Sequence, residues 1–473
     1  MTHLRFTIYD LRAVPSTVRP SSIVHRQCAG WLLVLMLALF SAGAQQRFPP
    51  PEFESGHKLP TATEPAARGF LRQYVDVAVL AGSLGLATWL AYRKRSRKAM
   101  IALSLFSVVY FGFWRKGCIC AIGSLQNVAL ALGDPNYALP ASVLGFFVLP
   151  LAVALFAGRS FCAAVCPHGA LQDLVLLKPI KVPDWLEQGL SVLPFIYLGA
   201  GVLFAATGSA FIICQYDPFV PVFRMSGRAL MVLSGVALLL LGVFVGRPYC
   251  RFLCPYGALL KLAATFSRWR VRVTPTHCTQ CRLCESSCPF GALYQPQAVE
   301  TEPRILRTDR RRLGLLLLLL PFLVTAGVFS APVVSSAMAR VHPTVALAER
   351  YLQEKDSPAK IGVLSPDDLA LERARQHPDE LLNQARVIQR KFKVGSWIFG
   401  GWIGLVIGLK LIALSLHRQR TDFEPASGAC FACARCFAFC PNELMRRGVT
   451  ISAIAATQAQ GTKEVLAQLE VAK

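Results

Sequence analysis

The chain contains the stretch Cys278-Thr-Gln-Cys281-Arg-Leu-Cys284-Glu-Ser-Ser-Cys288-Pro289, and the same spacing returns as Cys430-Phe-Ala-Cys433-Ala-Arg-Cys436-Phe-Ala-Phe-Cys440-Pro441. Each stretch is a C-x2-C-x2-C-x3-C-P run. Soft thiolates at this close spacing favour iron-sulfur ligation. The alternative is a pair of structural zinc sites, whose cysteine pairs are usually separated by a longer loop.

The two runs are predicted to form one unit. In runs of this type, three closely spaced thiolates hold one [4Fe-4S] cluster and the fourth reaches across to the other cluster. The predicted ligand sets are Cys278, Cys281 and Cys284 with Cys440, and Cys430, Cys433 and Cys436 with Cys288. Both runs must then lie on the same side of any membrane between them.

The composition indicates a polytopic membrane protein. Of 473 residues, 54% are hydrophobic and 16% are charged, and the mean hydropathy is +0.45, which is too apolar for a soluble protein of several domains. The net charge of +23 does not indicate nucleic-acid binding, because the basic residues cluster at the ends of apolar segments. Most of the 16 cysteines fall in motifs expected in the reducing cytoplasm, so we expect ligands rather than disulfides.

Residues 1–44 have the features of a signal peptide. Arginines precede the apolar run 31–40, and Ala42-Gly43-Ala44 offers a cleavage site between small residues. The alternative is an uncleaved short anchor. Residues 45–72 follow as a Pro-rich extracytoplasmic tether, and Cys28 is given no role.

Seven apolar segments have sufficient length to span a membrane. They are residues 73–92, 99–114, 140–157, 189–206, 228–246, 313–330 and 395–415. Basic blocks at 93–98, 247–272 and 307–312 orient them by the positive-inside rule, with the N-terminus outside. Both cysteine runs then lie in the cytoplasm, with a membrane hairpin between them.

The predicted fold is a mainly α transmembrane bundle with a split two-cluster ferredoxin-like domain on the cytoplasmic side. Its expected parts are the membrane core 73–270, the first ferredoxin half 271–306, a span 307–334, an extracytoplasmic helical segment 335–394, a span 395–416, the second ferredoxin half 417–450 and a tail 451–473. The extracytoplasmic segment is expected to be a solvated helical hairpin, with a docking surface for a partner as the alternative.

An internal repeat supplies more cysteines. The element Gly158-Arg159-Ser-Phe-Cys162-Ala-Ala-Val-Cys166-Pro167-His168-Gly169-Ala170-Leu171 returns as Gly246-Arg247-Pro-Tyr-Cys250-Arg-Phe-Leu-Cys254-Pro255-Tyr256-Gly257-Ala258-Leu259. Two parallel repeats imply a pseudo-twofold axis along the membrane normal, which would bring matching cysteines together. The sets expected to meet are Cys162, Cys166, Cys250 and Cys254 near the inner surface, and Cys118, Cys120 and Cys214 near the outer surface.

The Cys-Pro junctions favour an anionic metal site. Cysteines four residues apart share a helical face, and proline suits the first position of a new helix, whose free amides would point back at the thiolates. Arg159, Arg247 and Arg251 would add countercharge. We therefore predict a third iron-sulfur cluster at the four inner cysteines, the alternative being small buried hydrophobic residues. The three outer cysteines would hold a further cluster with an unidentified fourth ligand.

Two other polar positions are interpreted as structural. His168 is replaced by Tyr256 in the second copy, so we expect it to fill the helix start rather than to bind metal. Asp217-Pro218 is typical of a turn. The sequence contains no Gly-rich nucleotide fingerprint, hydrolase triad or C-x-x-C-H haem site.

These motifs resemble the membrane polyferredoxins of the NosR, NirI and NapH type. The resemblance rests on the two C-x3-C-P elements, Gly117-Cys118-Ile-Cys120-Ala-Ile-Gly123, Cys214-Gln-Tyr-Asp217-Pro218-Phe219 and the ferredoxin runs, and it covers most of residues 70–445. It implies electron transfer between the quinone pool or cytoplasmic donors and extracytoplasmic redox partners. The sequence departs from NosR in showing no large N-terminal extracytoplasmic domain and no threonine motif for covalent FMN, so a flavin step would be absent or supplied by a separate flavoprotein.

The sequence thus predicts an electron-transfer component of the bacterial cytoplasmic membrane rather than a stand-alone enzyme. The hydrocarbon layer is about 30 Å thick, too wide for one efficient transfer step, so redox sites are needed within it or at its edges. The alternatives are an iron-sulfur redox sensor, a maturation factor for a periplasmic metalloenzyme, and a quinol dehydrogenase subunit. The sequence shows no output domain for a sensor and no recognisable quinone pocket.

Overall fold

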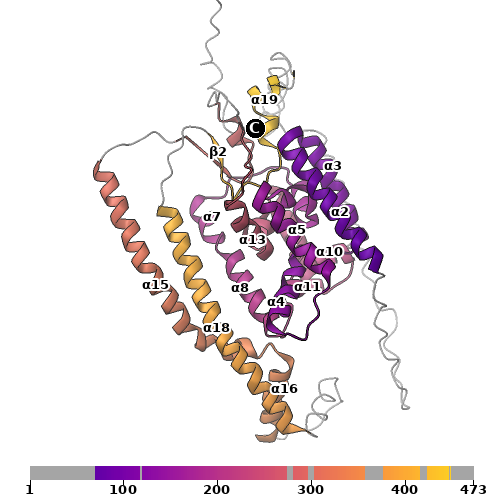
Figure 1. The fold of residues 1–473 in the computed structure, drawn as a ribbon, viewed down its shortest axis with the longest axis vertical. Helices are drawn as coiled ribbons and strands as arrows, with labels where there is room; N and C mark the ends of the chain where they lie inside the picture. The colour runs from indigo at the N-terminus through magenta and orange to yellow at the C-terminus, as the bar shows by residue number, and fades with distance from the viewer. Residues whose placement is uncertain are drawn as a thin grey trace, which may run out of the picture.

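The computed structural model describes residues 70–117, 120–273, 281–296, 303–356, 377–415, 423–446 and 448. The predicted signal peptide, most of the tether and the C-terminal tail lie outside these residues, as do Cys28, Cys118 and Cys278. The described chain is mainly helical, as predicted (Figure 1).

Five helical segments are long and apolar enough to cross a membrane. They are Leu71–Lys94, Arg97–Trp114, Asp184–Ala206, Arg311–Ala339 and Pro378–Ser415, and each coincides with a predicted span. The two remaining predicted spans form shorter apolar helices, α5 (Ala141–Ala157) and α11 (Ala229–Phe244). A third short apolar helix, α4 (Ala121–Gly133), was not predicted.

The N-terminal part of the core contains two segments that change from α- to π-helix. α2 (Phe70–Trp89) continues into η2 (Leu90–Lys94), and α3 (Arg97–Ser107) continues into η3 (Val108–Trp114). Asp76 of α2 accepts hydrogen bonds from Tyr110 at 2.9 Å and from Arg115. Because Asp76 is only 4% exposed, this ion pair fixes the two segments to each other.

Each C-x3-C-P element follows an apolar helix in the same way. After α5 the chain turns at Gly158, which has φ of 59°, and passes through η4 (Phe161–Val165) into α6 (Pro167–Leu174). After α11 it passes through α12 (Pro248–Phe252) into α13 (Pro255–Thr265). Both Cys-Pro junctions therefore start a helix with proline at its first position, as expected from the sequence.

The segment between these elements folds back into the core. α7 (Asp184–Leu190) and α8 (Leu193–Ala206) are followed by the short helices α9 (Ile212–Gln215) and α10 (Val220–Arg224). Ile213, Phe219 and Phe223 of this returning segment are at most 1% exposed. Their burial brings the polar residues between them, including Asp217, into the protein interior.

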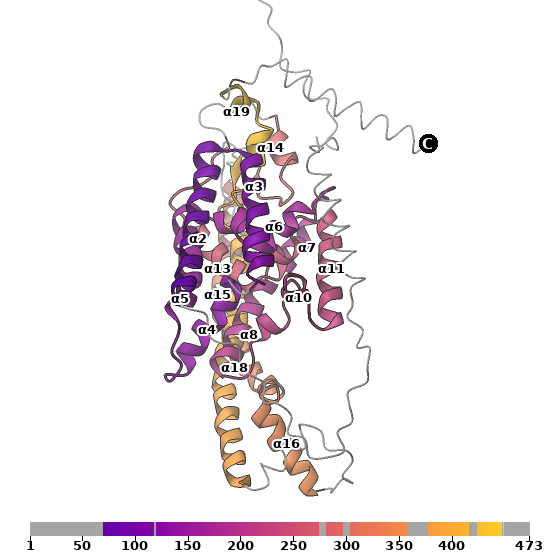
Figure 2. The same cartoon turned by 90° about the vertical axis from the view of Figure 1, so that its right-hand side faces the viewer.

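The pieces around the ferredoxin runs assemble at one end of the molecule (Figure 2). The described helices there are α14 (Leu283–Ser286), the 3-10 helix η5 (Cys436–Ala438) and α19 (Pro441–Arg446). Strand β1 (Leu293–Tyr294) pairs antiparallel with β2 (Glu424–Pro425), with Leu293 opposite Pro425. Segments that lie more than a hundred residues apart in the sequence are thus joined in one small sheet.

The long helices α15 (Pro303–Ala339) and α18 (Pro378–Ser415) form a hairpin beside the core. Their backbones meet through glycines: a Cβ on Gly400 would lie 2.1 Å from the carbonyl oxygen of Gly327, and one on Gly404 would lie 2.2 Å from that of Leu323. Such close contact between small residues is a common way for helices to associate in a bilayer.

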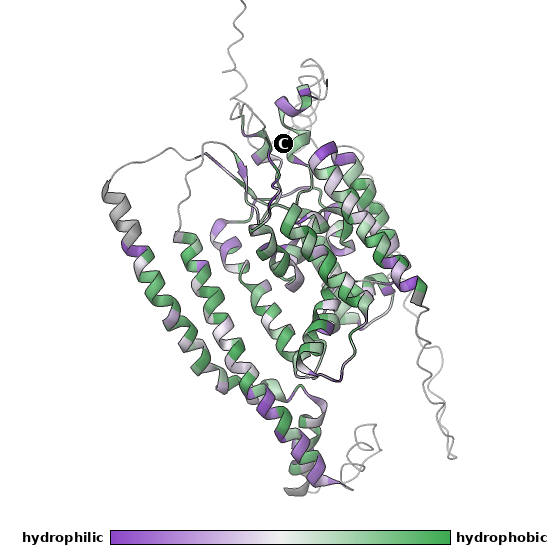
Figure 3. Ribbon diagram, in the orientation of Figure 1, coloured by the Kyte–Doolittle hydropathy of each residue, from purple (hydrophilic) through white to green (hydrophobic). Residues whose placement is uncertain are grey.

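The hairpin is attached to the core at two levels. Trp402 Nε1 of α18 donates to the carbonyl oxygen of Phe195 of α8 at 2.8 Å. At the end opposite the ferredoxin runs, α16 (Pro343–Asp356) packs against the first part of α18, with Phe392 fully buried between them and the core. The outer faces of this end are polar in Figure 3, as expected of a segment outside the hydrocarbon layer.

The glycine contact leads to a prediction for Gly404→Leu. The added side chain cannot fit against Leu323, so we expect the variant to be destabilised by about 1–3 kcal/mol, the usual cost of overpacking. Denaturant titration of the purified protein in detergent measures the loss. Gly314→Leu is the matched control, because nothing lies within 4 Å of a Cβ at Gly314. Equal stability of the two variants would contradict the proposed contact.

Candidate iron-sulfur sites

One set of ferredoxin cysteines forms a close group. Its members are Cys288 from the first run and Cys430, Cys433 and Cys436 from the second, and every pair lies near enough for the charges to interact. This is a crossed set of the kind that the spacing predicts. Of the other set, Cys281 interacts with Cys440 in the same way, and Cys284 is buried with Cys440 in one apolar group. Cys278 lies outside the described residues.

The backbone of both runs is shaped to receive an anion. Arg282, Ala432 and Ala434 have φ of 58°, 52° and 60°, although none is glycine. Left-handed residues within such turns direct successive N–H groups into one concavity, an arrangement found at many iron-sulfur sites. Ala432 N–H accordingly points to Cys430 Sγ at 3.4 Å. These loops therefore fit an anionic cluster held by thiolates.

The four cysteines of the C-x3-C-P elements also converge, at a site inside the core. Cys162, Cys166, Cys250 and Cys254 are 5%, 7%, 5% and 6% exposed, and all six pairs among them lie within range for their charges to interact. Gly257 N–H donates to Cys254 Sγ at 3.2 Å. This contact is the one predicted between a helix start and a thiolate. Gln172 Nε2 donates to Cys250 Sγ at 3.3 Å.

The glycines after the two Cys-Pro junctions have reciprocal surroundings. A Cβ on Gly169 would lie 3.0 Å from the carbonyl oxygen of Cys162 and 3.5 Å from Arg247. A Cβ on Gly257 would lie 3.2 Å from the carbonyl oxygen of Cys250 and 3.4 Å from Arg159. The arginine of each element therefore lies against the glycine of the other. A side chain at either position would enter the space beside the four thiols.

The described residues do not fit a single metal ion. Among them, no group of three or more His, Cys, Asp or Glu side chains is close enough to hold one. Thiolates around a zinc ion, with bonds of about 2.3 Å, would lie within about 4 Å of one another. A four-iron cluster separates its thiolates further because its own core lies between them. The described cysteines therefore do not form a compact site for one ion.

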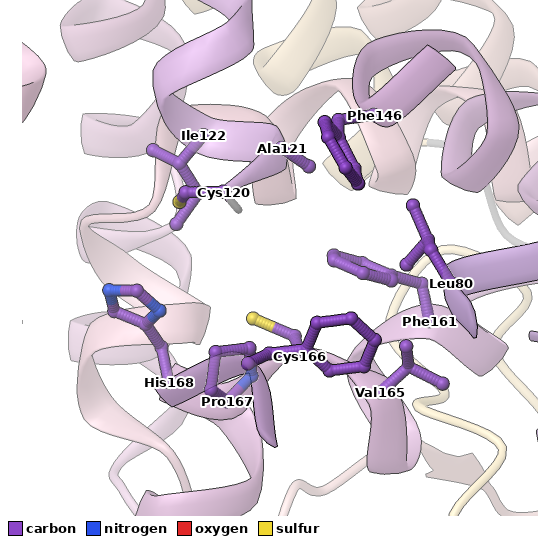
Figure 4. Close-up of a pocket in the computed structure, with 11 residues that line it drawn as sticks. Leu80, Cys120, Ala121, Ile122, Phe146, Phe161, Val165, Cys166, Pro167 and His168 are labelled. Carbon is purple, nitrogen blue, oxygen red and sulfur yellow. The ribbon is translucent and has the colours of Figure 1, made fainter. Parts of the chain in front are cut away.

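One of the outer cysteines, Cys120, lies closer to the inner set than the sequence predicts. Cys120 is within charge range of Cys214, and Cys214 Sγ would lie 3.2 Å from a Cβ on Gly123. However, Cys120 and Cys166 line the same cavity, and Figure 4 shows them on facing walls with Cys166 Sγ directed inward. Cys120 and Cys166 are therefore neighbours across this cavity, whereas Cys214 does not line it and is exposed. Cys118 lies outside the described residues.

An aromatic side chain joins the ferredoxin unit to the membrane site. Phe431, between Cys430 and Cys433, is 1% exposed, and the guanidinium carbons of Arg159 and Arg247 lie 4.1 and 5.2 Å from its ring centre. Arg159 also reaches Cys162 Sγ at 3.9 Å. The two arginines thus contact both sites at once.

Arg251 differs from the other two predicted sources of countercharge. Its guanidinium pairs with Glu187 at 2.6 Å and donates to the carbonyl oxygen of Phe290 at 3.2 Å. It therefore lies beside the first ferredoxin run instead of the four buried thiols. Arg247 takes the central position, donating to the carbonyl oxygens of Cys162 and Ala163.

Sequence reasoning missed a buried charge cluster beneath this junction. Asp173 of α6 is 1% exposed and pairs with Arg97 at 2.5 Å, Arg435 at 3.2 Å and Arg247 at 3.4 Å. Burial alone would raise the pKa of Asp173, but these arginines hold it well below its usual value, so the carboxylate stays charged. Arg97 also donates to the carbonyl oxygen of Cys433 at 3.2 Å. Short-range sequence patterns do not identify Asp173, because its partners come from distant parts of the chain.

The sequence also did not reveal that two polar residues, His168 and Asp217, are buried together. His168 does start α6, as expected, and Asp217 does form a turn by accepting from the N–H of Phe219 at 2.8 Å. Both residues are nevertheless buried, and His168 Nε2 lies 3.3 Å from Asp217 Oδ1. The sequence feature that could have indicated this buried pair is the histidine of Cys-Pro-His in the first element, where the second element has Cys-Pro-Tyr.

Two family models, each described as a 4Fe-4S binding domain, match the chain. One covers residues 139–183 and 228–274, which contain both C-x3-C-P elements, and the other covers residues 271–294, which contain the first ferredoxin run. These parts of the chain are therefore similar to 4Fe-4S binding domains.

Three curated proteins are similar to longer parts of the chain. Protein NirI of Paracoccus denitrificans is 38% identical over 164 residues, which are 31% of this chain and 24% of NirI. Regulatory protein NosR of Pseudomonas aeruginosa is 27% identical over 211 residues, 41% of this chain and 30% of NosR. The methylamine utilization ferredoxin-type protein MauN of Paracoccus denitrificans is 28% identical over 247 residues, 48% of this chain and 86% of MauN.

These matches confirm the resemblance inferred from the motifs: the chain is similar to NosR, NirI and MauN in the part that carries the C-x3-C-P elements. The aligned part covers less than a third of NirI and of NosR. No solved structure matches the chain at a significant level.

The charge cluster leads to a prediction for Asp173→Ala. Removing the carboxylate would leave three arginines without their shared partner, and breaking a buried ion pair in this way usually costs about 3–5 kcal/mol. We expect a loss of that size in denaturant titration. Glu349→Gln is the matched control, because Glu349 pairs with Arg340 at 3.0 Å at an exposed site, where a pair contributes at most about 1 kcal/mol. A cost at Asp173 no larger than the control would refute the assigned role.

Proposed function

We propose that this protein carries electrons across the bacterial cytoplasmic membrane, between a cytoplasmic donor or the quinone pool and an extracytoplasmic redox protein. The observation that carries the proposal is the junction at Phe431, where Arg159 and Arg247 contact the ring and lie within charge range of cysteines of both kinds of site. When bound, iron-sulfur clusters at these sites would accept and release single electrons.

The proposed ligand assignments follow the observed groups. One [4Fe-4S] cluster is assigned to Cys288, Cys430, Cys433 and Cys436, the second to Cys278, Cys281, Cys284 and Cys440, and a third iron-sulfur cluster to Cys162, Cys166, Cys250 and Cys254. The reciprocal placement of Arg159 and Arg247 supports a parallel internal repeat as the origin of the third site. A further cluster is assigned to Cys118, Cys120 and Cys214, as the sequence predicts.

The protein's own residues create the conditions for transfer. Burial keeps water from the four C-x3-C-P thiols, and Arg159 and Arg247 offset the negative charge that thiolates bring into a low-dielectric interior. Phe431 and Phe290, whose ring centres are 4.8 Å apart, fill the boundary between the ferredoxin unit and the core. The electron sites can therefore lie close together without water between them.

Topology supports a cytoplasmic position for the ferredoxin runs. Arg95 pairs with Glu443 at 2.8 Å, and Arg97 contacts Cys433, so the basic block at 93–98 lies at the same end as the second run. Basic residues of this kind mark the cytoplasmic side of bacterial membrane proteins. The extracytoplasmic partner would then approach the opposite end of the molecule, and a separate flavoprotein could fill that role.

The proposal predicts the behaviour of Cys250→Ser. Anaerobically purified wild-type protein should contain more than about eight irons per chain, the content of two [4Fe-4S] clusters, and the variant should lose about four. Cys250→Ser should keep both ferredoxin EPR signals yet stop transfer from an enclosed reductant to an acceptor outside reconstituted vesicles. Ser330→Ala, which alters an exposed residue of α15 outside all proposed sets, is the control. Iron near eight in the wild type, or undiminished transfer in Cys250→Ser, would count against the membrane site.

A further inference from the structure

Lys261 of α13 carries an amine without an anionic partner in the described part of the chain. The side chain is partly buried, and its Nζ lies 5.9 Å from the ring centre of Phe195 in α8. Trp402 of α18 donates to the carbonyl oxygen of the same phenylalanine, so Lys261 lies where the hairpin meets the core. Its amine makes no hydrogen bond to any residue that the structure describes. Removing an ammonium group from water without pairing it costs free energy, so this position favours an anionic ligand.

A second amine reaches the same boundary from the hairpin. Lys410, near the end of α18, is partly buried and donates from Nζ to Oε1 of Gln188 in α7 at 2.5 Å. It lies within charge range of Lys261. The amide of Gln188 is neutral, so it satisfies a hydrogen bond without offsetting the charge. Lysines within apolar helices are rare and usually functional.

The other charges at this boundary do not supply the missing anion. Arg159 and Arg251 add positive charge within range of Lys261, and Glu187 adds one negative charge. Glu187 is already paired with Arg251 at 2.6 Å. Cations therefore outnumber carboxylates here, and neither lysine forms an ion pair within the described residues.

Exposed apolar side chains lie next to both amines. Leu414 follows Lys410 by one helical turn, Leu262 follows Lys261 directly, and Phe266 lies one turn after Leu262; all three are exposed. Figure 1 shows α7 and the C-terminal end of α18 on the side of the core that carries β2, where the ferredoxin runs assemble. Positive amines beside exposed apolar surface fit a ligand with an anionic head and hydrocarbon chains.

We propose that Lys261 and Lys410 bind the phosphate headgroup of an anionic phospholipid, whose acyl chains lie along the exposed apolar side chains of α13 and α18. Basic pockets between transmembrane helices on the cytoplasmic side recognise cardiolipin and related headgroups. The proposed topology places this end in the cytoplasmic leaflet. A free phosphate would satisfy the amines but would leave the apolar side chains uncovered.

A lipid in this position would join the hairpin to the core. One lysine belongs to α13 of the core and the other to α18, which precedes the second ferredoxin run in the sequence. A Cβ on Gly428 would lie 3.2 Å from the carbonyl oxygen of Lys261 and 3.0 Å from Oγ1 of Thr265. The loop before Cys430 therefore rests on the same helix, and lipid binding would stabilise the second run against the core.

Thermal unfolding of the full-length protein in a neutral detergent tests the proposal, with cardiolipin, phosphatidylcholine or inorganic phosphate added in separate titrations. A ligand that binds only the folded state raises the unfolding temperature, and we expect this from cardiolipin alone. Lys261→Gln should weaken the apparent affinity for cardiolipin about fivefold, and the double variant with Lys410→Gln about thirtyfold, the usual contribution of one and two lysines near anionic lipid.

The matched control is the double variant Lys391→Gln with Lys393→Gln. It removes the same charge from exposed positions at the other end of α18, so it should keep the wild-type affinity. An equal loss of affinity in this control would show attraction to net charge alone and would overturn the proposal.

The remaining outcomes also decide the question. Equal stabilisation by cardiolipin and phosphatidylcholine overturns the proposal, because the headgroup charge then has no role. Equal stabilisation by cardiolipin and inorganic phosphate assigns the amines to a soluble anion and overturns it too. If Lys261→Gln does not fold, Lys410→Gln alone, with an expected loss of about fivefold, replaces it. None of these measurements depends on iron or electron transfer, so their failure leaves the proposed function in place.

Discussion

A carboxylate buried among three arginines is the interaction on which the rest of the structure depends. Asp173 meets Arg97 from the start of α3, Arg247 from the second C-x3-C-P element and Arg435 from the second ferredoxin run. A charge buried without a partner is costly, so these segments can enter the interior only together. The ferredoxin unit is therefore built into the membrane core rather than appended to it.

The same arginines have two physical roles. Basic residues at the ends of apolar segments set the orientation of a membrane protein, and here several of them turn inward: Arg97 reaches Asp173, and Arg159 and Arg247 enclose Phe431. Their charges lie beside thiols that would be negative when they bind iron. The high positive charge of the sequence thus reflects both the topology of the chain and the anionic groups that it is built to hold.

Cysteine spacing indicates which cysteines the fold brings near one another, but not where Cys120 lies. The crossed grouping of Cys288 with the second run, and the convergence of Cys162 with Cys250, follow from short-range spacing and repeat symmetry, which are visible in a sequence. The position of Cys120 is not. It depends on the chain folding back where Phe223 packs against Gly112, with a Cβ there only 2.7 Å from the ring. A hydropathy pattern predicts each apolar run as one straight span, so it does not predict that the segment containing Phe223 folds back into the core.

The proposed electron transfer in one direction requires the two C-x3-C-P elements to differ in their surroundings. Four thiols related by the proposed pseudo-twofold axis would be equivalent and would favour neither direction of transfer. The described core breaks this equivalence on one side, where His168 and Tyr249 come from different C-x3-C-P elements and meet at Asp217. On the other side Tyr256 bonds to the backbone at Phe147. The polar group formed by His168, Asp217 and Tyr249 lies toward Cys120, whereas the arginines lie toward the ferredoxin runs. The two faces of the buried thiols therefore have different electrostatic environments. Such a difference can set different reduction potentials at successive redox sites.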